Sequence, residues 1–434
     1  MTAQKQKHSY LRDGVSRSEV LAWASYDFAN SGYTTVVLTA VYNAYFVSIV
    51  AENAVWATLA WTLTITLSNI FSILVIPIVS SAADASANKR FWLTVMTLIC
   101  VICTAALYFT HTGSLALAVL LIVLSNTAFN AGVSLNSAFL SELAKTEAFG
   151  KVSGWGWGFG YLGGILSLGV CLMIVFAAQD SGKSAEDYVP LCMLSTAAIF
   201  MVVSLPMLLC VKERSKPSGL SFEKTVKNLW VQERSSFAVL KESPEFLKFC
   251  FCGLLYQAGI AVVVTLSAVY AELVMKFTTA QTITLILVVN ITAAVGAFFF
   301  GYVQDRLGHR KTLALTIFLW IVMGVTAAFS TSAASFWFAA NLSGIAMGSS
   351  QAAGRATVAV FAPEGQLAKF YSVWNIAVWG ANILGPITYG LVTWLTNGDQ
   401  RTAILVTTLY FVFGLIVLRM VRLPKKAPNI SSEL

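Results

Sequence analysis

The feature that most constrains this chain is the repetition of apolar blocks of about twenty residues, separated by short polar breaks. A helix of this length crosses the roughly 30 Å hydrocarbon core of a bilayer. Of the 434 residues, 57% are hydrophobic and only 11% are charged, whereas soluble domains have about 25% charged residues. The chain is therefore too apolar for a soluble globule, and the bilayer is its solvent.

This pattern predicts an all-α membrane protein with about twelve transmembrane helices. Their approximate limits are 20–50, 55–82, 91–110, 114–141, 150–178, 188–211, 246–274, 280–304, 312–330, 335–360, 366–395 and 402–423. The first 19 residues are polar and charged. No short apolar stretch with a small-residue cleavage site precedes the first block, so we expect no cleaved signal peptide.

Positive charges are divided unequally between the two sets of loops. If the N-terminus is cytoplasmic, the outer loops hold only Lys183, Lys276 and Arg401 of the 28 lysines and arginines. By the positive-inside rule, this asymmetry predicts that both termini are cytoplasmic. We expect a multi-pass protein of a plasma membrane, such as the inner membrane of a bacterium.

The longest polar break divides the chain into two sets of six spans. We therefore predict an N-terminal bundle (1–211), a cytoplasmic linker (212–245) and a C-terminal bundle (246–434). Apolar residues recur in the linker at near-helical spacing, opposite positive charges. This pattern suits a helix lying on the membrane surface, and it equally suits a solvated linker helix.

A single offset aligns the two halves with each other. It matches Asn69 with Asn290, Asp84 with Asp305, Phe149 with Phe370, and Gly164 with Gly385. A repeat after six spans keeps the same topology in both copies. The halves are therefore expected to be parallel repeats related by an axis along the membrane normal, with the substrate site at their interface.

The sequence lacks the signatures of redox, metal and ATP chemistry. All seven cysteines lie in apolar segments, and the CxxC of Cys100 and Cys103 has neither a second ligand pair nor a nearby histidine. The sequence has no Walker motif, nucleophile elbow or HExxH. We expect no cofactor, no metal and no nucleic-acid partner, and a monomer whose partners are a small-molecule solute, a coupling ion and membrane lipid.

A charged motif lies between the second and third spans of the second half. The pattern GxxxDRxGxRKxxL is formed by Gly301, Asp305, Arg306, Gly308, Arg310, Lys311 and Leu313. It closely resembles the signature of the major facilitator superfamily, which implies a fold of two pseudo-symmetric six-helix bundles. The first half has a degenerate copy in Asp84, Lys89 and Arg90.

The charges of this motif suit a gate. An aspartate can cap the next helix, favoured by its dipole, and the arginines can bridge to a neighbouring span when that side of the transporter is shut. We predict gating roles for Asp84, Arg90, Gly301, Asp305, Arg306 and Arg310, with better support at Asp305 than at Asp84. The alternative is that these charges serve only membrane topology.

Three further segments narrow the resemblance. Residues 22–46 (AWASYDFANSGYTTVVLTAVYNAYF), 154–164 (GWGWGFGYLGG) and 351–355 (QAAGR) resemble the branch typified by the yeast vacuolar amino-acid effluxer linked to autophagy and its bacterial relatives. This resemblance implies an export-type solute transporter. The glycines at 154–164 predict close approach to another helix, or bending as in a moving gate helix.

Polar stripes run along several spans. In the first span Asp27, Asn30, Ser31 and Thr34 lie on one helical face, and the major facilitator fold implies that the first, fourth, seventh and tenth spans line a central cavity. We therefore predict a substrate site formed by Asp27, Asn30, Tyr33, Asn130, Tyr256, Gln257, Gln351 and Arg355. The alternative for each serine and asparagine is interhelical hydrogen bonding.

Asp27 and Arg355 are the two charges buried in these helices, and an intramembrane charge is expected to be functional. The two can pair in the empty protein, and a zwitterion can replace the pair with its ammonium and carboxylate; separate structural partners are the alternative. Asp27 is the first candidate for proton coupling. Glu142 and Glu272, near span ends, are further candidates with solvated interfacial roles as the alternative.

These features predict a secondary active transporter that moves a small polar or zwitterionic solute, such as an amino acid or short peptide, by alternating access and proton-coupled export. Uptake or efflux of another organic solute by the same fold is the alternative. A membrane-embedded lipid-modifying enzyme would need a catalytic group of His, Asp or Cys near one membrane face, which the sequence does not offer. A channel is disfavoured by the repeat.

Overall fold

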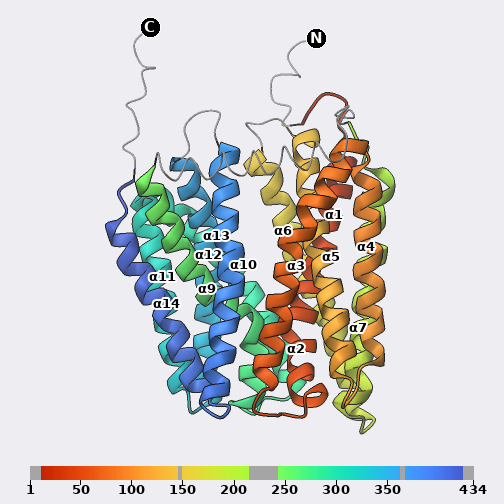
Figure 1. Ribbon diagram of the computed structural model, residues 1–434, viewed down its shortest axis with the longest axis vertical. Helices are drawn as coiled ribbons and strands as arrows, with labels where there is room; N and C mark the ends of the chain where they lie inside the picture. Colours follow the sequence, from red (N-terminus) through yellow and green to blue (C-terminus); the bar gives the residue numbers. More distant parts are fainter. Residues whose placement is uncertain (1–10, 145–148, 215–242, 362–366, 424–434) are drawn as a thin grey trace. The chain divides into compact units, whose positions relative to one another are not determined.

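The computed structural model describes residues 11–144, 149–214, 243–361 and 367–423, apart from some side chains within the helices (Figure 1). The predicted amphipathic segment of the linker falls almost entirely at 215–242, outside the described residues. Among the described residues the only pairing of strand type is a single bridge between Leu11 and Ala144. The predicted all-α class is confirmed.

The helices follow one another as the apolar blocks predict. They are α1 (Arg17–Tyr33), α2 (Tyr42–Tyr45), α3 (Ala57–Ser86), α4 (Lys89–Ala106), α5 (Leu115–Leu143), α6 (Phe149–Asp180), α7 (Ala185–Cys210), α9 (Pro244–Leu273), α10 (Thr279–Leu307), α11 (His309–Phe329), α12 (Ala333–Phe361), α13 (Leu367–Leu395) and α14 (Gln400–Met420). Two π-helical runs (Thr34–Ala40 and Phe46–Val50) and a short 3-10 turn (Leu107–Phe109) complete the order.

Within the described residues, eleven helices or helical runs are long and apolar enough to cross a membrane. The twelfth long helix, α12, has 29 residues and contains the polar stripe predicted for the tenth span. α12 is more polar than the other eleven because of this stripe. The prediction of about twelve membrane helices in two sets of six is confirmed.

Two compact units share these helices. One contains Met1–Leu229, Val263–Asn290 and Pro386–Ala403, and the other contains Trp230–Val262, Ile291–Gly385 and Ile404–Leu434. In the first unit α1 packs against α6 and α7, while α5 packs against α3 and α4 (Figure 1). The division into bundles at 1–211 and 246–434 stays a prediction.

Polar side chains fix where several helices begin. Ser16 caps α1 by accepting a hydrogen bond from the Glu19 N–H over 3.2 Å. Asn88 does the same for α4 through the Phe91 N–H over 3.3 Å, and Ser184 forms a reciprocal capping box with Asp187 before α7. Each cap satisfies an N–H that the first helical turn leaves without an intrahelical partner.

The glycines of α6 give the close helix approach that the sequence predicts. A Cβ on Gly160 would lie 2.9 Å from the Ser31 hydroxyl and 3.3 Å from the Asp27 carbonyl oxygen. A Cβ on Gly163 would collide with the Phe28 carbonyl oxygen. Close contact between backbones is how membrane helices gain packing energy without a hydrophobic driving force. The glycines therefore allow α1 and α6 to pack tightly against each other.

The same contacts recur in the second half, which supports the internal repeat. The Tyr26 hydroxyl of α1 lies against Gly132 of α5, and the Tyr256 hydroxyl of α9 lies against Gly354 of α12. The carbonyl oxygen of Ala258 in α9 lies against Gly385 of α13. First-to-fourth and first-to-fifth helix contacts are therefore made by equivalent residues in each half, with Gly385 equivalent to Gly163 and not to Gly164, with which the sequence offset aligns it.

The first span is not a single α-helix. After α1 the chain widens into the π-helical run Thr34–Ala40, bends at Val41 with φ −119°, and continues through α2 into a second π-helical run. π-Helical turns are rare and concentrate at functional sites. The buried Asn43 stabilises the bend, since its Nδ2 donates to the Thr39 carbonyl oxygen over 3.0 Å.

Candidate substrate and coupling site

Asp27 lies at the contact of three helices in the first unit. Its Oδ1 accepts a hydrogen bond of 3.1 Å from Nδ2 of Asn136 in α5. Its Oδ2 is packed against Gly156 of α6, where an added Cβ would collide with it and would lie 3.1 Å from the Trp23 ring. The Trp23 indole N–H donates to the main-chain carbonyl oxygen of Asn136 over 2.9 Å. This hydrogen bond fixes α1 to α5 beside the Asp27 carboxylate.

Asn136 is the residue of this site that sequence reasoning missed. It is almost completely buried, yet it does not belong to the stripe formed by Asn126 and Asn130. A polar amide in an otherwise apolar span was the available signal. Only the packing of α5 against α1 shows that this amide meets the carboxylate.

Asn30 and Tyr33, on the same helix as Asp27, differ in their surroundings. Asn30 is buried, and neither atom of its amide has a hydrogen-bond partner in the described part of the chain. Tyr33 is fully buried, shares a 2.9 Å hydrogen bond with the Ser125 hydroxyl and stacks on Phe129 at a centroid distance of 4.9 Å. Asn30 therefore retains hydrogen-bonding capacity that Tyr33 has already used.

The stripe of the fourth span forms a polar zipper with the second. Asn126 Nδ2 donates to the Ser68 hydroxyl over 2.5 Å, and Asn130 Nδ2 donates to the Ser72 hydroxyl over 2.9 Å. Each pair is one helical turn from the other, so α5 and α3 are joined along one seam. This is the interhelical bonding that the sequence left open as the alternative for Asn130.

Two predicted residues of the second half are brought together. The Gln257 and Gln351 amides exchange hydrogen bonds of 3.2 and 3.1 Å between α9 and α12. Tyr256, next to Gln257, is buried beside Gly354 and Trp374. An amide pair of this kind can open toward a polar ligand, because each amide keeps the second hydrogen of its NH₂ group and a second acceptor site.

Several predicted residues lie outside the described side chains: Asp84, Gly301, Asp305 and Arg355. Arg306 is exposed at the end of α10. Arg310 donates through Nη2 to the Arg419 carbonyl oxygen over 2.5 Å, which places a cation at the C-terminal end of α14. The gating roles of these residues stay predictions.

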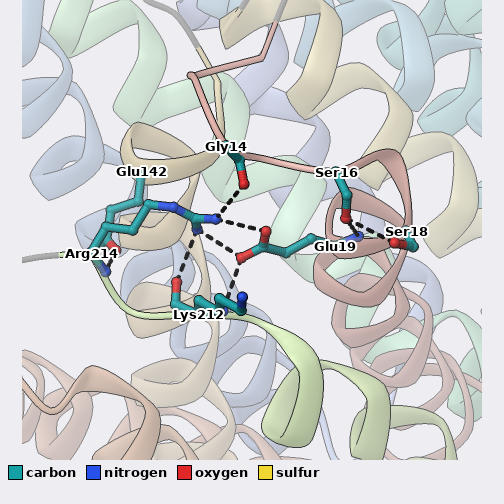
Figure 2. A network of polar contacts seen from close by, with 7 residues as sticks. All are labelled: Gly14, Ser16, Ser18, Glu19, Glu142, Lys212 and Arg214. Atoms are coloured by element: carbon teal, nitrogen blue, oxygen red, sulfur yellow. Dashed lines mark hydrogen bonds and ion pairs between the residues drawn. The ribbon is translucent and has the colours of Figure 1, made fainter.

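A charged network, which includes Glu142, surrounds the end of α7 (Figure 2). The Arg214 guanidinium donates to both carboxylate oxygens of Glu19, over 2.7 and 2.8 Å. The Lys212 N–H also reaches Glu19, over 2.9 Å. This contact with Glu19 raises the pKa of the Arg214 guanidinium above its ordinary value.

Glu142 connects this network to α4. One of its carboxylate oxygens accepts a hydrogen bond from the main-chain N–H of Arg214 over 2.6 Å. The other lies 2.9 Å from the buried Lys89 ammonium. Nearby Arg90 is exposed, and its main-chain N–H lies 3.5 Å from a carboxylate oxygen of Glu213. Glu142 is thus held by an ion pair at the helix ends, while its proposed part in proton coupling stays a prediction.

The second half repeats the glutamate contact. Glu245, at the start of α9, accepts a 2.6 Å hydrogen bond from the N–H of Arg422, the second residue after α14. Glu19, at the start of α1, binds Lys212, the second residue after α7. In each half, therefore, a glutamate of the first helix binds the main chain just after the end of the sixth helix.

Glu272 lies one residue before the end of α9, next to the hydroxyls of Thr279 and Thr282 in α10. Tyr188 of α7 donates to Thr279 over 3.2 Å. Glu272 therefore lies near a contact between the sixth span and the eighth, within one compact unit.

Other contacts between spans of the two halves lie in the same unit. Asn43 Nδ2 and the Trp61 indole N–H both donate to the Thr265 carbonyl oxygen, over 2.9 and 3.3 Å. Gln400 Nε2 donates to the Thr58 hydroxyl over 3.1 Å. These hydrogen bonds are buried and join spans of the first half of the chain to spans of the second.

The helical fold, together with the matches to known families and relatives, identifies a membrane transporter of the major facilitator superfamily. The chain belongs to the family described as vacuole effluxer Atg22-like, whose model matches residues 57–149 and 141–431. Both assignments confirm the resemblance found in the sequence. The family is one of transporters and not of enzymes.

Relatives by sequence agree with this assignment. The MFS-type transporter YxiO of Bacillus subtilis is 25% identical over 408 residues, covering 92% of this chain and 94% of YxiO. Autophagy-related protein 22 of Candida glabrata is 25% identical over 173 residues, covering 36% of this chain and 31% of that protein. The likeness to the yeast protein is therefore confined to about a third of each chain.

Solved structures share the fold. The D-xylose-proton symporter matches with a TM-score of 0.72 and 15% identity, covering 93% of this chain and 98% of that chain. A mutant of the nucleoside transporter NupG matches with a TM-score of 0.71 and 14% identity, over 93% and 98% of the two chains. At such identities the likeness shows the fold alone.

Proposed function

We propose that this transporter exports a small polar or zwitterionic solute, such as an amino acid or short peptide, in exchange for protons that bind at Asp27. It works by alternating access, with both termini in the cytoplasm of a bacterial cell. Asp27 with Asn136, Asn30, Gln257, Gln351 and Arg355 are the proposed solute and coupling residues.

The observation that carries this proposal is the surroundings of Asp27. Its described partner is a neutral amide, and Asn30 and Asn136 hold buried polar atoms without partners in the described part of the chain. A buried polar group left unpaired costs roughly 1–3 kcal/mol. A polar solute that bonds to these atoms recovers that free energy, whereas an apolar one does not.

The direction and the solute class have separate support. The family description names movement of a solute out of a vacuole, so the proposed direction rests on the resemblance of the sequence to export-type transporters. The predicted cavity spans carry one acid, Asp27, and one base, Arg355, which favours a solute with balanced charge. A polyanion or a bulky cation would leave one of the two unmatched.

The first experiment identifies the solute and then tests coupling. Purified protein is screened by thermal shift against amino acids, short peptides, nucleosides, sugars and organic anions, since a ligand of the native state raises its apparent stability. Proteoliposomes are then loaded with the best ligand. We expect a pH gradient to drive accumulation in wild type.

Asp27→Asn is expected to abolish accumulation while retaining part of solute exchange. Asn126→Ala, which removes an amide of the α3–α5 zipper, serves as the matched control and should still accumulate solute. Full accumulation by Asp27→Asn would refute the coupling role. If only organic anions or apolar compounds bind to the protein, the proposed class of small polar or zwitterionic solutes is refuted.

A further inference from the structure

The Asn136 amide is the described hydrogen-bonding partner of Asp27, and it is neutral. A buried carboxylate paired with lysine or arginine leaves an uncompensated cation when it is protonated. A carboxamide has a donor end and an acceptor end. It can therefore serve a carboxylate or a carboxylic acid, depending on which end faces the carboxyl group.

One end of this amide is in use and the other is spare. Nδ2 donates to Asp27 Oδ1 over 3.1 Å. Oδ1 of Asn136 is buried and has no hydrogen-bond partner among the described residues. A half-turn of the amide about its last torsion thus breaks no bond other than the one to Asp27.

The neighbouring contacts keep the two groups opposite each other. The Trp23 indole N–H donates to the main-chain carbonyl oxygen of Asn136 over 2.9 Å, which fixes the spacing of α1 and α5. The second carboxylate oxygen of Asp27 is packed against Gly156, so the carboxylate is held on the side of α6 as well. The pair can change its hydrogen bond without a change in backbone.

The other charged groups of α1 and of the helices packed against it lie at helix ends. The described ones on α1 and on the helices packed against it are Arg17 and Glu19 on α1, Glu142 on α5, Asp180 on α6, and Glu186 and Asp187 on α7. Glu19 is bound to Arg214, and Glu142 to Lys89. The side chain of Lys151, near the start of α6, lies outside the described residues.

We infer that Asn136 is the positioning residue of Asp27 and that its amide turns over with each protonation step. Nδ2 donates to the carboxylate; when a proton from water binds Oδ1 of Asp27, Oδ1 of Asn136 accepts that O–H. The buried acid is then hydrogen-bonded in both states. This inference rests on the proposed coupling role of Asp27 and adds the group that makes both states stable.

Infrared difference spectroscopy of the membrane-reconstituted protein tests the inference without a solute. A pH titration of wild type should show one buried carboxylic acid C=O band, which Asp27→Asn removes. In Asn136→Leu we expect this band at higher frequency, because the hydrogen bond to the acid is lost. Its titration midpoint should shift by about one pH unit, a tenfold change in proton affinity.

Asn126→Leu is the matched control, since it removes a buried amide from the same helix that bonds to Ser68. It should leave band and midpoint unchanged. An Asn136→Leu band equal to that of wild type in frequency and midpoint would overturn the inference.

A second measurement needs no variant at position 136. Wild-type protein with isotopically labelled asparagine amides should show a labelled signal in the pH-difference spectrum as the amide turns. The absence of an asparagine signal would overturn the inference. Failure of the coupling proposal looks different, since accumulation by Asp27→Asn would persist whatever the infrared band does.

Discussion

The side-chain amide of Asn43 donates a 2.9 Å hydrogen bond to the main-chain carbonyl oxygen of Thr265, joining the bend of the first span to the seventh span. Asn43 is fully buried. Trp61 donates to the same oxygen. Alternating access requires contacts at one end of the protein to open, and this buried node is the contact we expect to break.

Asn43→Ala should favour opening at this contact, because it removes a side-chain donor to the Thr265 carbonyl oxygen. A cysteine at the buried Thr58 reports the opening through its rate of modification by a maleimide in purified protein. We expect severalfold faster labelling in Asn43→Ala. Asn130→Ala, whose bond to Ser72 lies within the first half, is the control. Equal labelling rates in both variants would contradict the expectation that the Asn43–Thr265 contact breaks on opening.

Gly163→Ala should destabilise the protein, because its methyl group meets the Phe28 carbonyl oxygen, and backbone cannot move aside as a side chain can. Overpacking of this kind costs about 1–3 kcal/mol. Gly169, on the same helix, has open space around its Cβ position. Gly169→Ala should therefore be neutral or slightly stabilising in thermal unfolding, and an equal loss in both variants would show that close approach to α1 is not the cause.

A double-mutant cycle should detect the Glu19–Arg214 pair. With two hydrogen bonds and a Glu19 side chain only 7% exposed, we expect a coupling free energy of about 1 kcal/mol or more from Glu19→Gln and Arg214→Gln. The comparison pair is Glu245 with Lys248, which is more exposed and should give a clearly smaller coupling free energy. Equal coupling in the two cycles would argue against a clamp at the end of α7.

Asp399 should make stability depend on pH at the start of α14. Hydrogen bonds from Thr402, first from its hydroxyl, lower the pKa of the Asp399 carboxyl. Its stabilisation is therefore complete above the unfolded pKa of about 4 and is lost as pH falls through the lower folded value. Asp399→Asn should unfold with a weaker dependence on pH in this acidic range, whereas Asp399→Ala should also lose about 1 kcal/mol at neutral pH, as expected for a cap. Unchanged acid unfolding in both would exclude this contribution.

The limits of α5, predicted at 114–141, are Leu115–Leu143 in the structure, because an apolar block bounded by polar residues fixes where a helix enters and leaves the membrane. Asp27 was singled out because an intramembrane charge is costly wherever it lies. The sequence predicts the interhelical bonding of Asn126 and Asn130 only as an alternative to substrate binding. A polar stripe shows which residues share a helix face, but not which helix packs against that face.

The sequence by itself determined the class, the number of spans and the repeat, because the hydrocarbon core imposes a fixed length and polarity on every crossing segment. Only the tertiary structure decided the partners. It placed the Asn136 amide on Asp27, the Arg214 guanidinium on Glu19 and the Asn43 amide on Thr265, at sequence separations of 109, 195 and 222 residues. Such pairs depend on the packing and rotation of whole helices, which no local pattern encodes.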